Sequence, residues 1–124
     1  MPVITAAEGA VHEVHGARFT SYATSATGST ELAAWRLEIP AGSRGVPHTI
    51  SREEVFLVQA GELAFSIDDE QTTARAGDVV IAPAGCRLAV HGSEREAGRA
   101  WVTTRLGLRA ELADGTVLSP PWAA

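Results

Sequence analysis

Residues 45–85 read GVPHTISREEVFLVQAGELAFSIDDEQTTARAGDVVIAPAG, and this stretch decides the fold of the 124-residue chain. It contains three short runs rich in apolar residues, at 53–59, 62–68 and 78–83. Segments containing Gly, Asp or Pro separate these runs, which is the pattern of short strands joined by turns. The stretch therefore predicts β-structure rather than helices.

The same pattern continues on both sides of this stretch. Further strands, each bounded by Gly, Pro, Ser or Asp, are expected at 17–25, 31–40, 87–91, 99–106 and 108–112. No segment sustains a helical period, and short strands at regular spacing predict a sandwich or barrel. Tight turns are expected at 59–62, 68–70 and 114–115, the first as a hairpin.

Strand 53–59 is apolar on both faces. Phe56 and Val58 share the face of Glu54, whereas Leu57 lies on the other face. We expect the first face to line the barrel and the second to meet another subunit, because exposed apolar patches mark interaction sites. The sequence thus predicts a homodimer.

Several positions in the quoted stretch stand at defined spacings. Ile50 and Glu54 follow His48, and six residues separate Glu54 from Gly61. This arrangement resembles the first sequence motif of the cupin family, G-x5-H-x-H-x(3,4)-E-x6-G. His48 and Glu54 match, and Ile50 stands where the family has its second histidine.

The end of the stretch resembles the second cupin motif, G-x5-P-x-G-x2-H-x3-N. Gly77, Pro83 and Gly85 match, whereas Leu88 replaces the histidine and Gly92 replaces the asparagine. The resemblance, carried by residues 45–61 and 77–92, implies one domain over residues 1–124. It also implies an all-β antiparallel jelly-roll barrel with a ligand cavity, in a family that is commonly dimeric.

The resemblance further implies a divalent metal held by three histidines and one glutamate, which are donors suited to first-row transition metals. Only His48 and Glu54 remain of that set, because Ile50 and Leu88 offer no lone pair. Two ligands bind a metal weakly, so we expect no cofactor. The alternative is a divalent transition metal bound through His48, Glu54 and a further residue.

Three other histidines are candidates for that further ligand. Strand alternation places His91 on the face opposite Leu88, away from the cavity. His12 and His15 lie three residues apart in VHEVHG, which reads as strand or loop. Residues three apart in such a segment point in opposite directions, so we interpret both as surface histidines.

Without a metal, the cavity is expected to be apolar and to bind a small apolar molecule. Its expected ligand-binding residues are Trp35, Ile50, Phe56, Leu88, Val90 and Trp101. His48 and Glu54 are the expected catalytic residues, since a His/Glu pair in a dry pocket can act as general acid and base. The alternative is a structural pair hydrogen-bonded to each other. Thr103 or Arg105 either orients the ligand or faces solvent.

Composition excludes several classes of partner. The net charge is −5, and the ten basic residues are all arginine and form no cluster, which argues against nucleic acid and against an anionic membrane. No apolar run approaches the length of a membrane span, and the N-terminus lacks a secretory pattern. The single cysteine, Cys86, is consistent with a reducing compartment, so we expect a cytoplasmic protein.

Three functions remain open at this point. The first is a metal-independent or weakly metal-binding isomerase, cyclase or lyase of secondary metabolism that acts on an apolar metabolite. The second is a non-catalytic ligand-binding or accessory cupin. The third is a metal-dependent, dioxygenase-like cupin with an unusual ligand set. The missing ligands disfavour the third function, and we favour the first.

Overall fold

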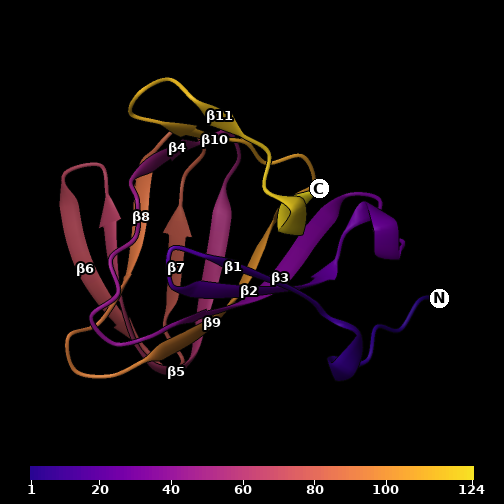
Figure 1. Ribbon diagram of the computed structural model, residues 1–124, viewed down its shortest axis with the longest axis horizontal. Helices are drawn as coiled ribbons and strands as arrows, with labels where there is room; N and C mark the ends of the chain where they lie inside the picture. The colour runs from indigo at the N-terminus through magenta and orange to yellow at the C-terminus, as the bar shows by residue number, and fades with distance from the viewer.

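The computed structural model describes all 124 residues, and the chain is built almost entirely from β-strands (Figure 1). The strands are β1 (Ala10–Val14), β2 (Ala17–Ala23), β3 (Leu32–Ile39), β4 (His48–Ile50), β5 (Glu54–Ile67), β6 (Glu70–Arg75), β7 (Val79–Ala82), β8 (Arg87–Gly92), β9 (Gly98–Arg105), β10 (Ala110–Leu112) and β11 (Val117–Leu118). The helical segments are three 3-10 turns, η1 (Ala6–Glu8), η2 (Ser25–Thr27) and η3 (Pro121–Ala123). Each of these helical segments has three residues, so none of them could span a bilayer.

Two antiparallel sheets share strand β5 and curl into a jelly-roll barrel, which confirms the predicted fold class. The first half of β5 pairs with β7 and β9, and β9 continues that sheet through β3 and β2 to β1. The second half of β5 pairs with β6 and β8, and β8 continues the other sheet through β4 and β10 to β11. In Figure 1 the C-terminal strands β10 and β11 lie over one end of the barrel.

The hairpin predicted at residues 59–62 is wrong, because β5 runs through these residues as one continuous strand. Its pairing with β9 shifts register between Val58 and Ala60, which marks a β-bulge. Gly61 has a φ of 65°, and a Cβ at this position would lie 1.8 Å from the carbonyl oxygen of Ala97. A residue without a side chain therefore lets the strand bend where two backbones meet closely.

The other predicted strands are present, with ends shifted by at most two residues, and the turns at 68–70 and 114–115 also form. The prediction missed β4, β6 and β11 and left β1 open between strand and loop. Strand β6 reads EQTTAR and buries only Ala74, so it lacks the apolar alternation of a half-buried strand. Strands β4 and β11 are too short to produce a periodic signal.

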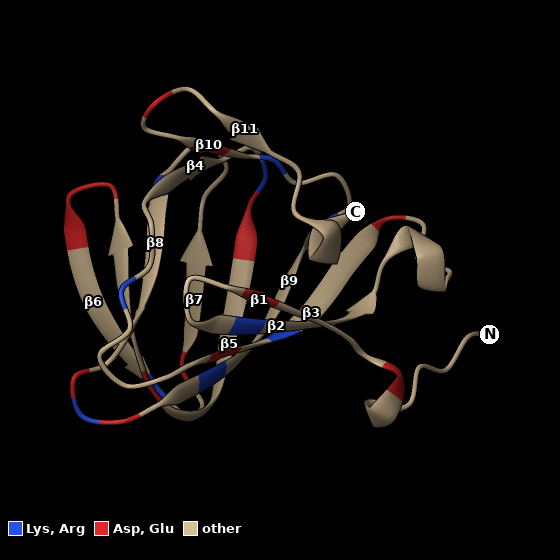
Figure 2. Cartoon of the chain, viewed as in Figure 1, with Lys and Arg blue, Asp and Glu red and all other residues tan.

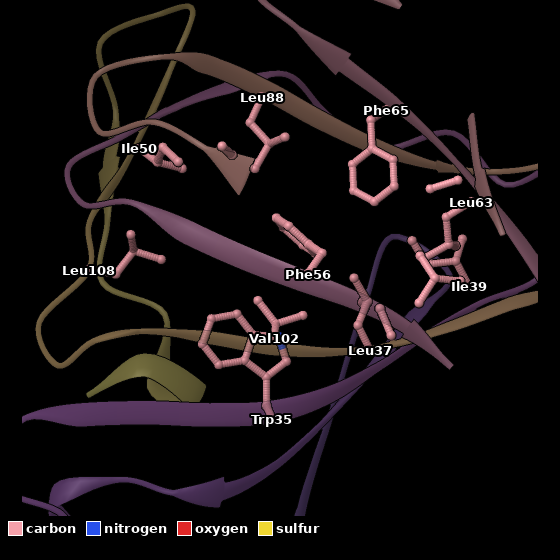
Figure 3. Close-up of a cluster of buried hydrophobic side chains, with 14 of the residues drawn as sticks. Trp35, Leu37, Ile39, Ile50, Phe56, Leu63, Phe65, Leu88, Val102 and Leu108 are labelled. Carbon is pink, nitrogen blue, oxygen red and sulfur yellow. The ribbon is translucent and has the colours of Figure 1, made fainter. Parts of the chain in front are cut away.

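One apolar cluster with contributions from both sheets lies in the barrel interior (Figure 3). Trp35 of β3 and Leu88 of β8 project toward each other from opposite walls, and Phe56 of β5 lies between them. Phe56 packs edge-on against Phe65, with ring centroids 5.2 Å apart. Burial stabilises the fold by about 1.5–3 kcal/mol for each large side chain of this kind, so the cluster holds the two sheets together.

Figure 2 shows the arginine positions scattered along the chain and interspersed with acidic positions. Glu62 is one of two buried acids, with an exposure of only 2%. Its carboxylate accepts hydrogen bonds from Ser93 Oγ at 2.6 Å and from Arg95 Nη2 at 3.1 Å. This network ties β5 to the turn between β8 and β9.

Candidate functional site

A cavity of about 270 Å³ lies among the inner side chains of the barrel, and 15 of its 22 lining residues are hydrophobic. The larger apolar lining residues are Phe19, Trp35, Leu37, Phe56, Leu88, Val90, Leu108 and Trp122. A mostly apolar pocket with a few placed polar groups is the usual form of a small-molecule site. The ionisable residues in the lining are His15, Arg44, His48 and Glu54.

The C-terminal segment supplies one wall of this cavity. Trp122 of η3 stacks on Phe19 of β2, with ring centroids 4.0 Å apart and planes inclined by 14°. The neighbouring Ala123 is fully buried, and its carbonyl oxygen accepts a hydrogen bond from the backbone N–H of Gly107 at 2.8 Å. These contacts fix the segment against the barrel and hold Trp122 in the cavity wall.

Glu54 begins β5 and lines the cavity. The residue is 4% exposed, and its side chain makes no hydrogen bond or ion pair with another residue. Burial away from water disfavours the charged carboxylate and raises the pKa of Glu54 from 4.5 to about 8. At neutral pH the group is therefore mainly a carboxylic acid that can donate a proton.

His48 begins β4, where it pairs with Leu88 of β8 and Leu112 of β10. Its Nδ1 lies 2.9 Å from the carbonyl oxygen of Val46. A carbonyl oxygen only accepts, so Nδ1 carries the hydrogen and Nε2 of the neutral ring carries the lone pair. The imidazole is thereby oriented with one nitrogen free to accept a proton or a hydrogen bond.

No hydrogen bond or ion pair joins His48 to Glu54. The alternative interpretation, a structural pair hydrogen-bonded to each other, therefore does not describe this site. The two groups line one cavity separately. Two separate groups can each form a hydrogen bond with, or exchange a proton with, a different atom of a single ligand.

The donors present do not fit a tightly held transition metal. Ile50 and Leu88 are buried aliphatic residues at the positions where the family motifs place histidines. No group of three or more His, Cys, Asp or Glu side chains is placed to hold a metal ion. Protein sites for such metals ordinarily use three or four converging donors, whereas His15, His48 and Glu54 line this cavity without being grouped around one point.

The side chain of His91 is directed away from the cavity, as strand alternation predicted. Leu88 and Val90 of the same strand line the cavity, whereas His91 does not. Its Nδ1 accepts a hydrogen bond from the backbone N–H of Gly45 at 2.9 Å. His91 therefore supports the loop between β3 and β4 rather than a metal.

The two N-terminal histidines have different surroundings. His12 is half-buried beside Trp122, with ring centroids 5.7 Å apart, and lies outside the cavity lining. His15 is exposed, as predicted, but it also reaches the cavity lining. His15 has a φ of 51° in the turn between β1 and β2, a conformation that strand alternation does not describe.

Of the six residues predicted to bind the ligand, four line the cavity and two do not. Ile50 is fully buried in the core but lies outside the lining. Trp101 also lies outside it, because its partner across β3 is Arg36 and the neighbouring Val102 faces the core instead. The four that do line the cavity are Trp35, Phe56, Leu88 and Val90.

Some lining residues have no signal in the two motifs. These are the residues of the N-terminal hairpin, the loop before β4 and the C-terminal segment, among them Phe19, Arg44, Leu108, Leu118 and Trp122. The sequence signals available for them were Phe19 and Leu108 in predicted strands and a tryptophan close to the C-terminus. Thr103 and Arg105, the alternative orienting residues, lie outside the lining, and Arg105 is exposed.

Comparison with protein families gives one match, in which residues 35–103 match the family described as Cupin domain. The match covers more than half of the 124-residue chain. A comparison with curated protein sequences finds no match.

Solved structures with a similar fold include the polyketide cyclase RemF from Streptomyces resistomycificus, with a TM-score of 0.76 and 13% identity over 85% of this chain and 79% of that chain. The DMSP lyase DddQ from Ruegeria pomeroyi DSS-3 gives a TM-score of 0.71 and 24% identity, over 88% of this chain and 63% of that chain. The cupin domain of Cnp3 from Schizosaccharomyces pombe gives 0.69 and 18%, over 82% and 71%. At these identities the likeness establishes the fold alone.

Proposed function

The chain belongs to the cupin family, and we propose that it binds a small apolar metabolite in the barrel cavity and performs acid–base chemistry on it. The observation that carries the proposal is a buried, unpartnered carboxyl group, Glu54, in a mostly apolar cavity. A buried polar group without a partner costs free energy, which a ligand that accepts its hydrogen bond can recover.

In the proposed chemistry, His48 and Glu54 act on different atoms of the ligand. Nε2 of His48 takes a proton from a carbon next to a carbonyl group, while Glu54 donates its proton to the carbonyl oxygen. The C–H bond breaks, an O–H bond forms, and the ligand becomes an enol. Return of a proton to carbon completes an isomerisation, and attack by or loss of a neighbouring group would complete a cyclisation or elimination.

Isomerase, cyclase or lyase is the reaction class proposed. A polyketide cyclase and a DMSP lyase are among the proteins with a similar fold, which supports the class by analogy only. The apolar lining and Glu54, the one acidic residue of that lining, carry the argument.

The test uses 1-tetralone, an apolar bicyclic ketone, and follows exchange of its α-hydrogens in D₂O by NMR. We expect the protein to accelerate exchange, and His48→Gln and Glu54→Gln each to reduce the acceleration at least tenfold while the ketone still binds. His12→Gln is the matched control, because His12 lies outside the cavity lining. Unchanged exchange in both cavity variants would refute the roles given to them.

A non-catalytic ligand-binding cupin is the second candidate, favoured by the lack of contact between His48 and Glu54. Binding of 1-tetralone without accelerated exchange would support it. Elemental analysis of the purified protein tests the metal-dependent alternative. We expect far less than one equivalent of transition metal, and one equivalent lost in His48→Ala would overturn that expectation.

We further propose that the protein is a cytoplasmic homodimer. The outer face of the first sheet exposes Leu57, Val79 and Ile81 by 40%, 56% and 58%, and β7 pairs on one side only, with β5. A second copy would cover this apolar edge. Sedimentation should show a dimer that Ile81→Arg converts to a monomer, and a monomeric wild type would refute the proposal. The cytoplasmic location rests on the single cysteine, which is free and buried.

A further inference from the structure

Arg44 is the arginine in the lining of the cavity, and it has no acidic partner. The ion pairs of the protein engage other arginines, namely Arg18, Arg36, Arg75 and Arg95. Arg44 is exposed while it lines the cavity, so it stands at the rim where the cavity meets solvent. A cation at the rim of an apolar cavity is available to a ligand.

The loop that carries Arg44 is fixed against β8. The backbone N–H of Gly45 donates to His91 Nδ1 at 2.9 Å, and the N–H of Gly92 donates to the carbonyl oxygen of Ser43 at 2.7 Å. A Cβ on Gly45 would lie 2.2 Å from the carbonyl oxygen of Val90, so the loop lies directly on the strand. The backbone on both sides of Arg44 is therefore held before any ligand arrives, which lowers the entropic cost of binding.

Neither Glu54 of the cavity lining nor the nearby His91 compensates the charge of Arg44 at neutral pH. Burial raises the pKa of Glu54 to about 8, so the one acidic lining residue is mainly neutral. Burial lowers the pKa of His91, and the positive charge of Arg44 lowers it further. A neutral His91 keeps a lone pair on Nδ1 for the N–H of Gly45, consistent with the loop position described above.

The cavity volume limits the size of the apolar part of a ligand. An apolar cavity of about 150 Å³ accommodates benzene. The present volume of about 270 Å³ therefore fits a body of one or two six-membered rings. Trp35, Phe56 and Trp122 in the wall offer aromatic surface to such a body.

We infer that the ligand is a hydrophobic carboxylic acid, with one or two rings inside the barrel and its carboxylate on Arg44 at the rim. The inference rests on the proposed function, because it assigns a substrate class to the same cavity. A single guanidinium matches one planar, singly charged carboxylate by two parallel hydrogen bonds. A phosphate carries nearly two charges and is less well matched by one arginine.

Calorimetric titration with 2-naphthoate and with its uncharged amide, 2-naphthamide, tests the inference. We expect wild-type protein to bind the acid about fivefold to tenfold more tightly than the amide. Arg44→Met should remove the preference without weakening amide binding, and Arg44→Lys should retain part of it. Arg105→Met is the matched control, since Arg105 is equally charged, exposed and outside the lining.

The outcomes separate this inference from the proposed function. Equal binding of acid and amide by wild type, or an unchanged preference in Arg44→Met, would overturn the inference while leaving an apolar binding cavity in place. Failure of both compounds to bind would overturn the inference and the proposed function together. Loss of the preference in Arg105→Met as well as in Arg44→Met would show a general charge effect and would also overturn the assignment to Arg44.

Discussion

Replacing Glu54 by glutamine should make the protein less sensitive to alkaline pH. Glutamine keeps the size of the side chain and cannot ionise, whereas Glu54 must lose a proton inside an apolar cavity as pH rises. The pKa of Glu54 is raised by burial from 4.5 to about 8. The stabilisation of the folded state linked to this group is complete below pH 4.5 and is lost as pH rises through about 8.

The magnitude follows from these two pKa values. Linkage between proton binding and folding gives a loss of about 2 kcal/mol by pH 6 and about 5 kcal/mol by pH 9, relative to acidic solution. The difference between these pH values is about 3 kcal/mol, and the glutamine variant should not show it. Other titrating groups contribute equally to both proteins and cancel in the comparison.

Urea unfolding followed by tryptophan fluorescence at pH 6 and pH 9 measures this difference directly. We expect the free energy of unfolding of wild type to fall by about 3 kcal/mol more than that of Glu54→Gln over this interval. Parallel curves for the two proteins would refute the reasoning. They would mean that Glu54 reaches water or a polar partner and is already ionised at neutral pH.

Two further predictions concern the scaffold, and a third concerns the wall of the cavity. Gly61→Ala should cost about 2 kcal/mol or more beyond Gly115→Ala, because both glycines have positive φ but a Cβ meets a neighbouring backbone only at Gly61; equal thermal melts would contradict this. Glu62→Gln should destabilise the protein at pH 7 but much less at pH 3, since hydrogen bonds from Ser93 and Arg95 lower the pKa of Glu62 and their benefit is lost as pH falls through it. An equal loss in urea unfolding at both pH values would rule this out. Trp122→Ala should weaken 1-tetralone binding several-fold, whereas Trp122→Phe keeps the stacking on Phe19 and should bind nearly as wild type; calorimetric affinities that rank the two variants equally would count against a wall role for Trp122.

The barrel and the centre of the site could be predicted because they depend on local spacing. Glu54 and Phe56 lie two residues apart in one strand, so a period of two places both side chains on the same face. The same reasoning placed Trp35 inside and His91 outside. Each of these assignments requires only one strand and one residue in it whose inward or outward direction is already known.

The parts that could not be predicted depend on contacts between distant segments. Trp101 was expected in the cavity, but its face is set by its register against Arg36 of β3, which no local pattern specifies. Trp122 lines the cavity because it stacks on Phe19, roughly a hundred residues earlier in the chain. A turn was expected around Gly61, where the structure has a bulge. Both structures use a glycine with positive φ, so the local sequence does not distinguish them.

The bulge in β5 also shifts the alternation of inward and outward side chains along the strand by one residue. Before it, the inward residues have even numbers, as in Glu54 and Phe56, whereas after it Leu63 and Phe65 are buried at odd numbers. One extra residue thus changes which positions of β5 face the barrel interior. The change occurs where the strand passes from one sheet into the other. Substitutions in this strand act locally, but deletion of Ala64, beyond the bulge, would turn the later side chains of β5, Phe65 among them, to the opposite face. Alignments of related barrels should therefore tolerate gaps in the loops and exclude them from this segment.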